Sequence, residues 1–185
     1  MRFFVLFLFA ALLMSACRDI SIPWGFPRAK SGAKSEAVSA DSEKGGIAMR
    51  FASGDPVLDE IALEARAAIS DFIRHMRNPQ KGEEQFRIKY PFPADSGSGI
   101  DKEYIWLSGI TFKNGRYYGC VANRPYYISG IKEGSEAAFS MDDIADWMYL
   151  RNGKIVGGRS IKYLIEKIPP LDRDEEMERV LSSFP

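Results

Sequence analysis

The spacing of apolar residues changes along the chain, and each spacing predicts one kind of element. Asp55 and Pro56 are typical of a helix start, and apolar residues then recur every three or four positions up to Met76. This pattern predicts one long amphipathic helix that ends near Asn78-Pro79. From Phe86 onward apolar and polar residues alternate, which predicts half-buried β-strands.

Two Asn-Gly pairs predict tight hairpins between these strands. Asn114-Gly115 and Asn152-Gly153 suit two-residue turns, in which both positions take positive φ angles. Turn signals at intervals of about 8 to 12 residues are typical of twisted or barrel-like sheets. We therefore expect an α+β fold in which one long N-terminal helix packs on a strongly twisted antiparallel sheet of five to six short strands, barrel-like, with a short C-terminal helix.

The first residues have the pattern of a secretory signal peptide. Arg2 precedes an apolar run, Phe3–Met14, which is shorter than the roughly 20 residues of a membrane-spanning helix. The following Ser15-Ala16-Cys17 resembles the end of a lipobox, although Met14 stands where leucine is usual. We expect lipidation of Cys17 and a membrane-anchored lipoprotein that faces the periplasm. A soluble periplasmic or secreted protein is the alternative.

These patterns divide the chain into four segments. Residues 1–16 form the expected signal peptide, and residues 17–50 comprise the lipidated cysteine and a flexible linker rich in Ser, Ala, Gly and Lys. Residues 51–168 are expected to form a single α+β domain, and residues 169–185 a C-terminal tail that is predicted to be helical.

Composition argues against several functions. The chain has 25 basic and 25 acidic residues, whereas nucleic-acid binding usually needs a basic surplus. His75 is the only histidine, so zinc sites with paired histidines are excluded. Phosphate-loop and dinucleotide motifs are missing as well. We expect no metal, no cofactor and no nucleic-acid partner.

Aromatic residues on the predicted strands suggest a binding surface. Alternation turns about half of them away from any one core, and this surplus favours contact with a protein or peptide. The candidates are Trp106, Trp147 and Tyr149, with Asp146 orienting the loop before them. The alternative is that these aromatics form the core of a small sheet.

Two carboxylates allow a catalytic hypothesis. Asp146 and Glu103 would serve as acid and base if both lay in one cleft about 5 to 10 Å apart. Asp146 also has a structural interpretation, in which it accepts a hydrogen bond from a strand backbone or pairs with Arg151.

Several short motifs resemble one bacterial family. In chain order they are Glu103-Tyr104-Ile105-Trp106, Gly119 to Asn123, Pro125, Ile144-Ala145-Asp146-Trp147-Met148, Gly153-Lys154 and Gly157-Gly158. From about Asp55 to Ile168 the chain is similar to the YegJ-like family of uncharacterised bacterial proteins. It departs at Tyr104, where the family is expected to have histidine. The resemblance implies a fold unit and no activity.

These observations favour a non-catalytic, lipid-anchored envelope protein whose α+β domain binds a protein or peptide. A carboxylate-based hydrolase acting on envelope sugars or peptides is one alternative. A periplasmic immunity-type protein that neutralises a toxin is another, since small inert domains suit that role.

Overall fold

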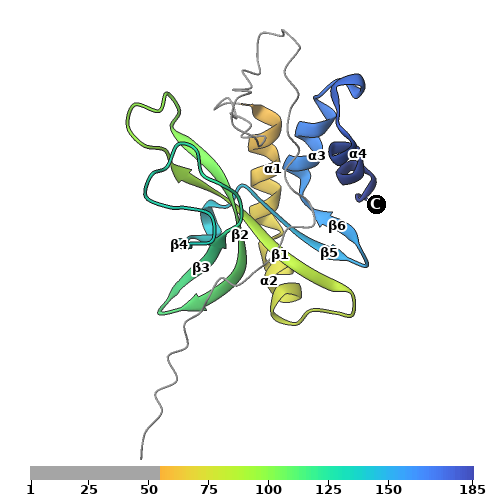
Figure 1. Ribbon diagram of the computed structural model, residues 1–185. Coiled ribbons are helices and arrows are strands. Elements are labelled where there is room, and N and C mark those ends of the chain that lie inside the picture. Colours follow the sequence, from red (N-terminus) through yellow and green to blue (C-terminus); the bar gives the residue numbers. More distant parts are fainter. Residues whose placement is uncertain (1–54) are drawn as a thin grey trace, which may run out of the picture.

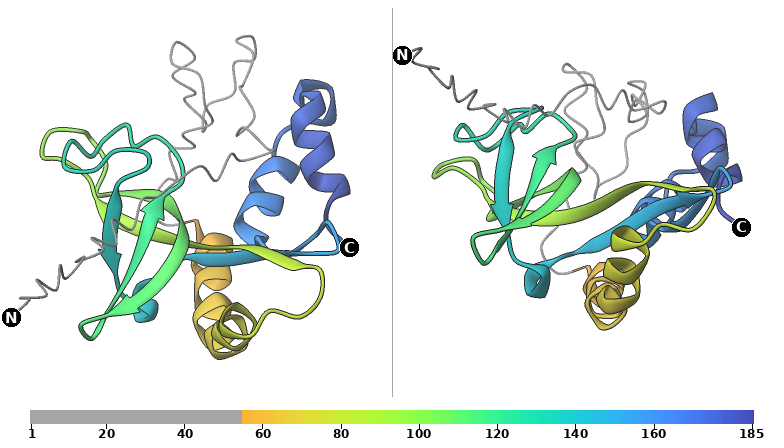
Figure 2. Two further views of the ribbon diagram at one scale, coloured as in Figure 1. Left: turned by 60° about the horizontal axis from the view of Figure 1, so that its bottom comes forward. Right: turned by 90° about the horizontal axis from the view of Figure 1, so that it is seen from below.

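A six-stranded antiparallel sheet with helices on both faces forms the centre of the computed structural model, which describes residues 55–185 (Figures 1 and 2). The predicted signal peptide, Cys17 and the linker lie outside the described residues.

The strand order in the sheet is β4-β3-β2-β1-β5-β6. The first four strands form a meander, and the hairpin of the last two returns to pair β5 with β1. The strands are β1 (Glu83–Pro93), β2 (Lys102–Lys113), β3 (Arg116–Val121), β4 (Glu136–Phe139), β5 (Asp146–Arg151) and β6 (Lys154–Gly157). The helices are α1 (Pro56–Ala67), α2 (Ile69–Arg77), α3 (Arg159–Glu166) and α4 (Glu175–Ser182), with 3-10 turns η1 (Met141–Asp143) and η2 (Pro170–Asp172).

The two faces of the sheet pack against different helices, as the right-hand view of Figure 2 shows. Ile88 pairs with Leu107 and Trp147, and these side chains share a core with Phe72 of α2. We call this side the α1 face. Neighbouring strand residues point the other way, and Trp106 and Met148 share a second core with residues of α3 and α4. We call this side the α3 face.

Both predicted hairpins are confirmed. Asn114-Gly115 connects β2 to β3, and Asn152-Gly153 connects β5 to β6. All four residues have positive φ angles, between 51° and 76°. This is the conformation that makes an Asn-Gly pair favourable at a two-residue turn.

The predicted barrel-like sheet was wrong, because the sheet is open and ends at β4 and β6. Closure would require these two edges to pair. The end of the chain occupies the outer edge of β6 instead, where the Ile155 N–H donates to the Ser183 carbonyl at 2.8 Å. The expectation of uniformly short strands was wrong too, since β1 and β2 have 11 and 12 residues.

The predicted long N-terminal helix was also wrong. Two short helices, α1 and α2, take its place, and Ala68 separates them with φ −95° and ψ 6°. Beyond this break Phe72 packs against Phe86 and Trp147. No proline or glycine marks this break in the sequence.

The C-terminal segment packs on the sheet through α4. Met177, Val180 and Phe184 are buried in the core of the α3 face. In residues 55–185 every helix is too short or too polar to cross a membrane.

Candidate functional site

The four residues predicted to contact a partner lie on opposite faces of the sheet. Trp106 and Asp146 belong to the α3 face, and both are neighbours of Lys89 on the central strand β1. Trp147 and Tyr149 belong to the α1 face. The structure therefore brings the first two together and separates them from the other two.

Trp147 and Tyr149 attach the first two helices to the sheet. The Trp147 Nε1–H donates to the Ala65 carbonyl of α1 at 3.0 Å, and its ring lies 5.5 Å from that of Phe72. Tyr149 is buried between the rings of Phe86 and His75. Both side chains belong to the core of the α1 face, which is the alternative role that the sequence allowed for these aromatic residues.

The two carboxylates of the catalytic hypothesis also lie on opposite faces. Glu103 pairs with Phe92 on the α1 face, and its carboxylate accepts the backbone N–H groups of Tyr126 and Tyr127 at 2.9 and 2.8 Å. Asp146 lies on the α3 face. The structure does not place this pair in one cleft.

Asp146 connects β5 to the start of α3. Its two carboxylate oxygens accept the backbone N–H groups of Trp147 and Ser160, both at 2.8 Å. The residue is 2% exposed. Burial raises the pKa of this carboxyl, and the hydrogen bonds from Ser160 and the charge of Lys89 oppose that rise. The backbone-accepting role that the sequence suggested is confirmed.

A double glycine sets the position of α3 relative to Asp146. Gly157 and Gly158 have φ angles of 77° and 66°. A Cβ atom on Gly157 would lie 2.3 Å from the Trp147 carbonyl oxygen. Only glycine permits this close backbone approach, which brings the Ser160 N–H to Asp146.

Lys89 lies inside the structure between Trp106 and Asp146. It is 5% exposed, and its ammonium donates to Ser160 Oγ at 3.1 Å. The ammonium is also 5.5 Å from the centre of the Trp106 ring. Burial lowers the pKa of Lys89 to about 8, although the negative charge of Asp146 works in the opposite direction.

Arg87 lies on the same face of β1 as Lys89, next to a β-bulge. It is 3% exposed, and its Nη2 is 3.3 Å from Gln85 Oε1. Its buried Nε has no hydrogen-bond partner, and no described carboxylate forms an ion pair with it. Burial lowers the pKa of the guanidinium, which still remains a cation at neutral pH.

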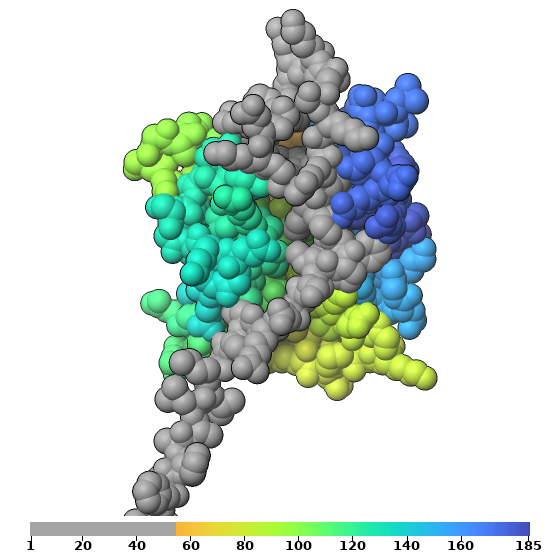
Figure 3. Space-filling model, viewed as in Figure 1, coloured from red at the N-terminus to blue at the C-terminus, as the bar shows by residue number. Residues whose placement is uncertain are grey.

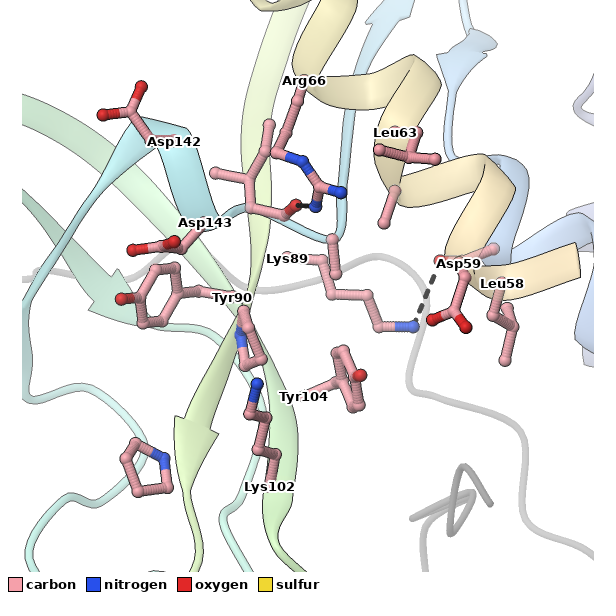
Figure 4. Close-up of a pocket in the computed structure, with 16 residues that line it drawn as sticks. Leu58, Asp59, Leu63, Arg66, Lys89, Tyr90, Lys102, Tyr104, Asp142 and Asp143 are labelled. Atoms are coloured by element: carbon pink, nitrogen blue, oxygen red, sulfur yellow. Dashed lines mark hydrogen bonds between the residues drawn. The ribbon is translucent and has the colours of Figure 1, made fainter. Parts of the chain in front are cut away.

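A pocket of about 710 Å³ lies where β1 ends and β2 begins, against α1 and η1 (Figure 4). Lys89 extends into it between Arg66 and Tyr104. Arg66 is held in place because its Nη1 donates to the Ile144 carbonyl at 2.9 Å. Leu63 of α1 lies on its wall and is 62% exposed.

Sequence reasoning missed the residues of this pocket. None of Trp106, Asp146, Trp147 and Tyr149 lines it. Lys89 alternates with apolar residues, a pattern that indicates a solvated side chain when only one sheet face is covered. Nothing in the local pattern indicates that both faces are covered. Among residues 55–185 no group of three or more His, Cys, Asp or Glu side chains is placed to hold a metal ion.

The described structure is thus an α+β protein with an open antiparallel sheet, a buried arginine and lysine on its α3 face, and a pocket at the end of the central strands. The chain belongs to DUF2314, a family of uncharacterised proteins conserved in bacteria, whose model matches residues 55–180. This confirms the YegJ-like resemblance expected from the motifs.

Two relatives match part of the chain. The uncharacterised protein YegJ of Escherichia coli (strain K12) is 33% identical over 119 residues, which are 60% of this chain and 75% of that protein. A putative ankyrin repeat protein of Neisseria meningitidis serogroup B is 31% identical over 88 residues, 48% of this chain and 35% of the relative. No solved structure matches the chain.

Proposed function

We propose that this chain is an exported, lipid-anchored envelope protein whose α+β domain binds a protein or peptide partner. The pocket between α1 and the ends of β1 and β2 is the observation that carries the binding proposal. The apolar run Phe3–Met14, followed by Ser15-Ala16-Cys17, supports export and lipidation. The linker through residue 50 would let the domain reach a partner away from the membrane surface.

The pocket has the chemistry of a polypeptide-binding site. Leu63, Pro91, Pro93 and Tyr104 supply apolar and aromatic walls. Charged side chains of both signs line the rest of the pocket: Asp59, Arg66, Lys89, Lys102, Asp142 and Asp143. Its volume of about 710 Å³ lies within the roughly 300–1,000 Å³ of typical ligand pockets. A large apolar side chain from a partner fits the apolar walls, and the charged side chains can pair with polar groups of the same partner segment.

Leu63 gives the pocket an exposed apolar rim. A leucine that is 62% exposed beside a pocket loses its contact with water when a partner covers it. Leu171 is also exposed, at 99%, but it belongs to η2 and does not line the pocket. The two leucines therefore form a matched pair, in which only Leu63 is expected to contact the partner.

Site-specific photo-crosslinking in intact cells tests the binding proposal. Benzoylphenylalanine replaces Leu63 in one variant of the full chain and Leu171 in another. We expect a discrete adduct only from position 63, and its loss when Tyr104→Ala is added. Adducts of equal yield from both positions, or none from position 63, would contradict binding at this pocket.

Metabolic labelling tests the lipid anchor separately. We expect radioactive palmitate to enter the wild-type chain and not the Cys17→Ser variant, which should also leave the membrane fraction. Equal membrane association of both chains, with no label in either, would contradict lipidation at Cys17.

A further inference from the structure

The α3 face buries more positive than negative charge around β1. Arg87 and Lys89 are 3% and 5% exposed, and Asp146 is 2% exposed. Lys89 lies opposite Asp146 on β5, whereas Arg87 lies opposite Met148. The only buried carboxylate of this set is therefore placed next to Lys89, and one positive charge at Arg87 is left uncompensated.

The guanidinium of Arg87 has more hydrogen-bond donors than the described residues can pair with. A guanidinium has five N–H donors in a planar fork. Within residues 55–185 its side chain makes one long hydrogen bond, to Gln85, and its buried Nε has no partner. Burying a guanidinium cation with so few hydrogen bonds is strongly unfavourable unless an anion pairs with it.

Another buried charge on the same strand, Glu83, has a structural role and is fully hydrogen-bonded. Glu83 of β1 is buried, and its carboxylate accepts the Gln80 N–H at 2.9 Å, contacts His75 Nδ1 at 3.0 Å and accepts Arg151 Nε–H at 2.9 Å. All of these partners come from the chain itself. Among residues 55–185 no such set surrounds Arg87, so we look for its partner outside these residues.

We propose that Arg87 receives a single carboxylate, from an Asp or Glu side chain of the bound polypeptide. This inference rests on the proposed function and names the group that the partner contributes. Lys89 lines the pocket. Arg87 precedes it by two residues on the same face of β1, about 7 Å along the strand. Arg87 does not line the pocket, so the proposal requires the partner segment to extend beyond Lys89 along this face of the strand.

A carboxylate matches both the charge and the shape of this position. Arg87, Lys89 and Asp146 together carry one net positive charge, which one carboxylate neutralises. A phosphate dianion would leave an excess of negative charge. The two oxygens of a carboxylate also match the fork formed by Nε and one terminal nitrogen of the guanidinium.

Nuclear magnetic resonance of the arginine Nε–H groups in the full chain tests this proposal. The probes are N-acetylglutamate amide and N-acetylglutamine amide, which differ in charge and hardly in shape, at constant ionic strength. We expect the glutamate probe alone to shift the Arg87 signal in a saturable manner. The Arg87→Lys variant identifies that signal by its loss, and the signal of Arg151, already paired with Glu83, serves as the control.

Equal shifts with both probes, or no saturable shift, would overturn the carboxylate assignment. The source of the carboxylate is tested with a variant in which Asp19, Glu36, Asp41 and Glu43 become amides. An Arg87 signal that this variant leaves unchanged supports an external carboxylate. A changed signal in the absence of probe would assign the carboxylate to the chain's own residues and overturn its assignment to a partner.

The outcome is distinguishable from that of the crosslinking experiment. A discrete adduct at position 63 with no probe-dependent shift would retain the proposed function and overturn the role of Arg87. A saturable glutamate shift with no adduct would support a carboxylate site and contradict polypeptide binding at the pocket.

Discussion

The two faces of the sheet are both buried, but they are built from different chemistry. On the α1 face Phe72, Ile88, Ile105 and Leu107 are fully shielded from water. On the α3 face, Arg87, Lys89 and Asp146 are almost as deeply buried as that apolar set. Apolar burial stabilises the folded state, whereas buried charges oppose folding unless they are paired. The comparison indicates that the buried cations lie on the α3 face, whereas the buried carboxylates of Glu83 and Glu103 on the α1 face have hydrogen-bond partners within the chain.

Aromatic packing strengthens this contrast on the α1 face. Phe86 stacks on Tyr149 with ring centres 4.9 Å apart, and Tyr149 stacks on Trp147 at 6.2 Å. Such pairs add to the stability that burial provides. On the α3 face the ammonium of Lys89 lies 5.5 Å from the centre of the Trp106 ring.

The largest effect is expected from truncating the centre of the α1 face. Phe72→Ala removes a ring that is 0% exposed and contacts Phe86 and Trp147, so it should lower the free energy of unfolding by about 3–5 kcal/mol. Urea denaturation of the variant measures this loss. Leu171→Ala removes a side chain that is 99% exposed and should change stability by less than about 0.5 kcal/mol. Similar losses from both would contradict the assignment of the core.

A slightly smaller loss is expected on the α3 face from Asp146→Ala. This change removes the acceptor of the Trp147 and Ser160 N–H groups and leaves Lys89 buried without its opposing charge. We expect a loss of about 2–4 kcal/mol in urea denaturation. A loss below about 1 kcal/mol would show that Asp146 neither anchors α3 nor balances Lys89.

A smaller effect should appear as a dependence of stability on pH. The pKa of Lys89 is about 8 in the folded chain, below its ordinary value of 10.5. Between these values the unfolded chain holds a proton that the folded chain has lost, so stability rises with pH from about 8 to 10.5, by about 3 kcal/mol in total. The cost of burying the ammonium is fully present below pH 8.

The matched control for this pH dependence removes both charges. Tyrosines with raised pKa values also titrate in the alkaline range, so the wild-type chain is compared with Lys89→Met/Asp146→Asn. The double variant should lack the rise that the wild type shows. Parallel pH profiles for the two chains would contradict the burial of a charged Lys89.

Local patterns in the sequence predicted local structure well. Asp55 caps α1 by accepting the Val57 N–H at 3.0 Å, and the Asn-Gly hairpins form as expected. The sheet topology was not predictable in this way. Pairing of β5 with β1 joins residues about 60 positions apart, and no residue pattern specifies which edge the last hairpin adds to.

The candidate site was predicted only in part for a related reason. The backbone role of Asp146 follows from its residue type and position and was anticipated. Lys89 and Arg87 alternate with apolar residues in β1, which is the pattern of a strand with one face in water. Their burial depends on tertiary packing, which the pattern of one strand does not encode.

The stability of Arg87→Met tests the central claim most directly, with Arg151→Met as its matched control. If Arg87 is retained for a partner, replacing its uncompensated charge by an apolar side chain should raise the free energy of unfolding by about 1–2 kcal/mol. Arg151→Met should lower stability, because it deprives Glu83 of a partner. Destabilisation of both variants in the same urea titration would show that Arg87 is a structural residue and would contradict the account.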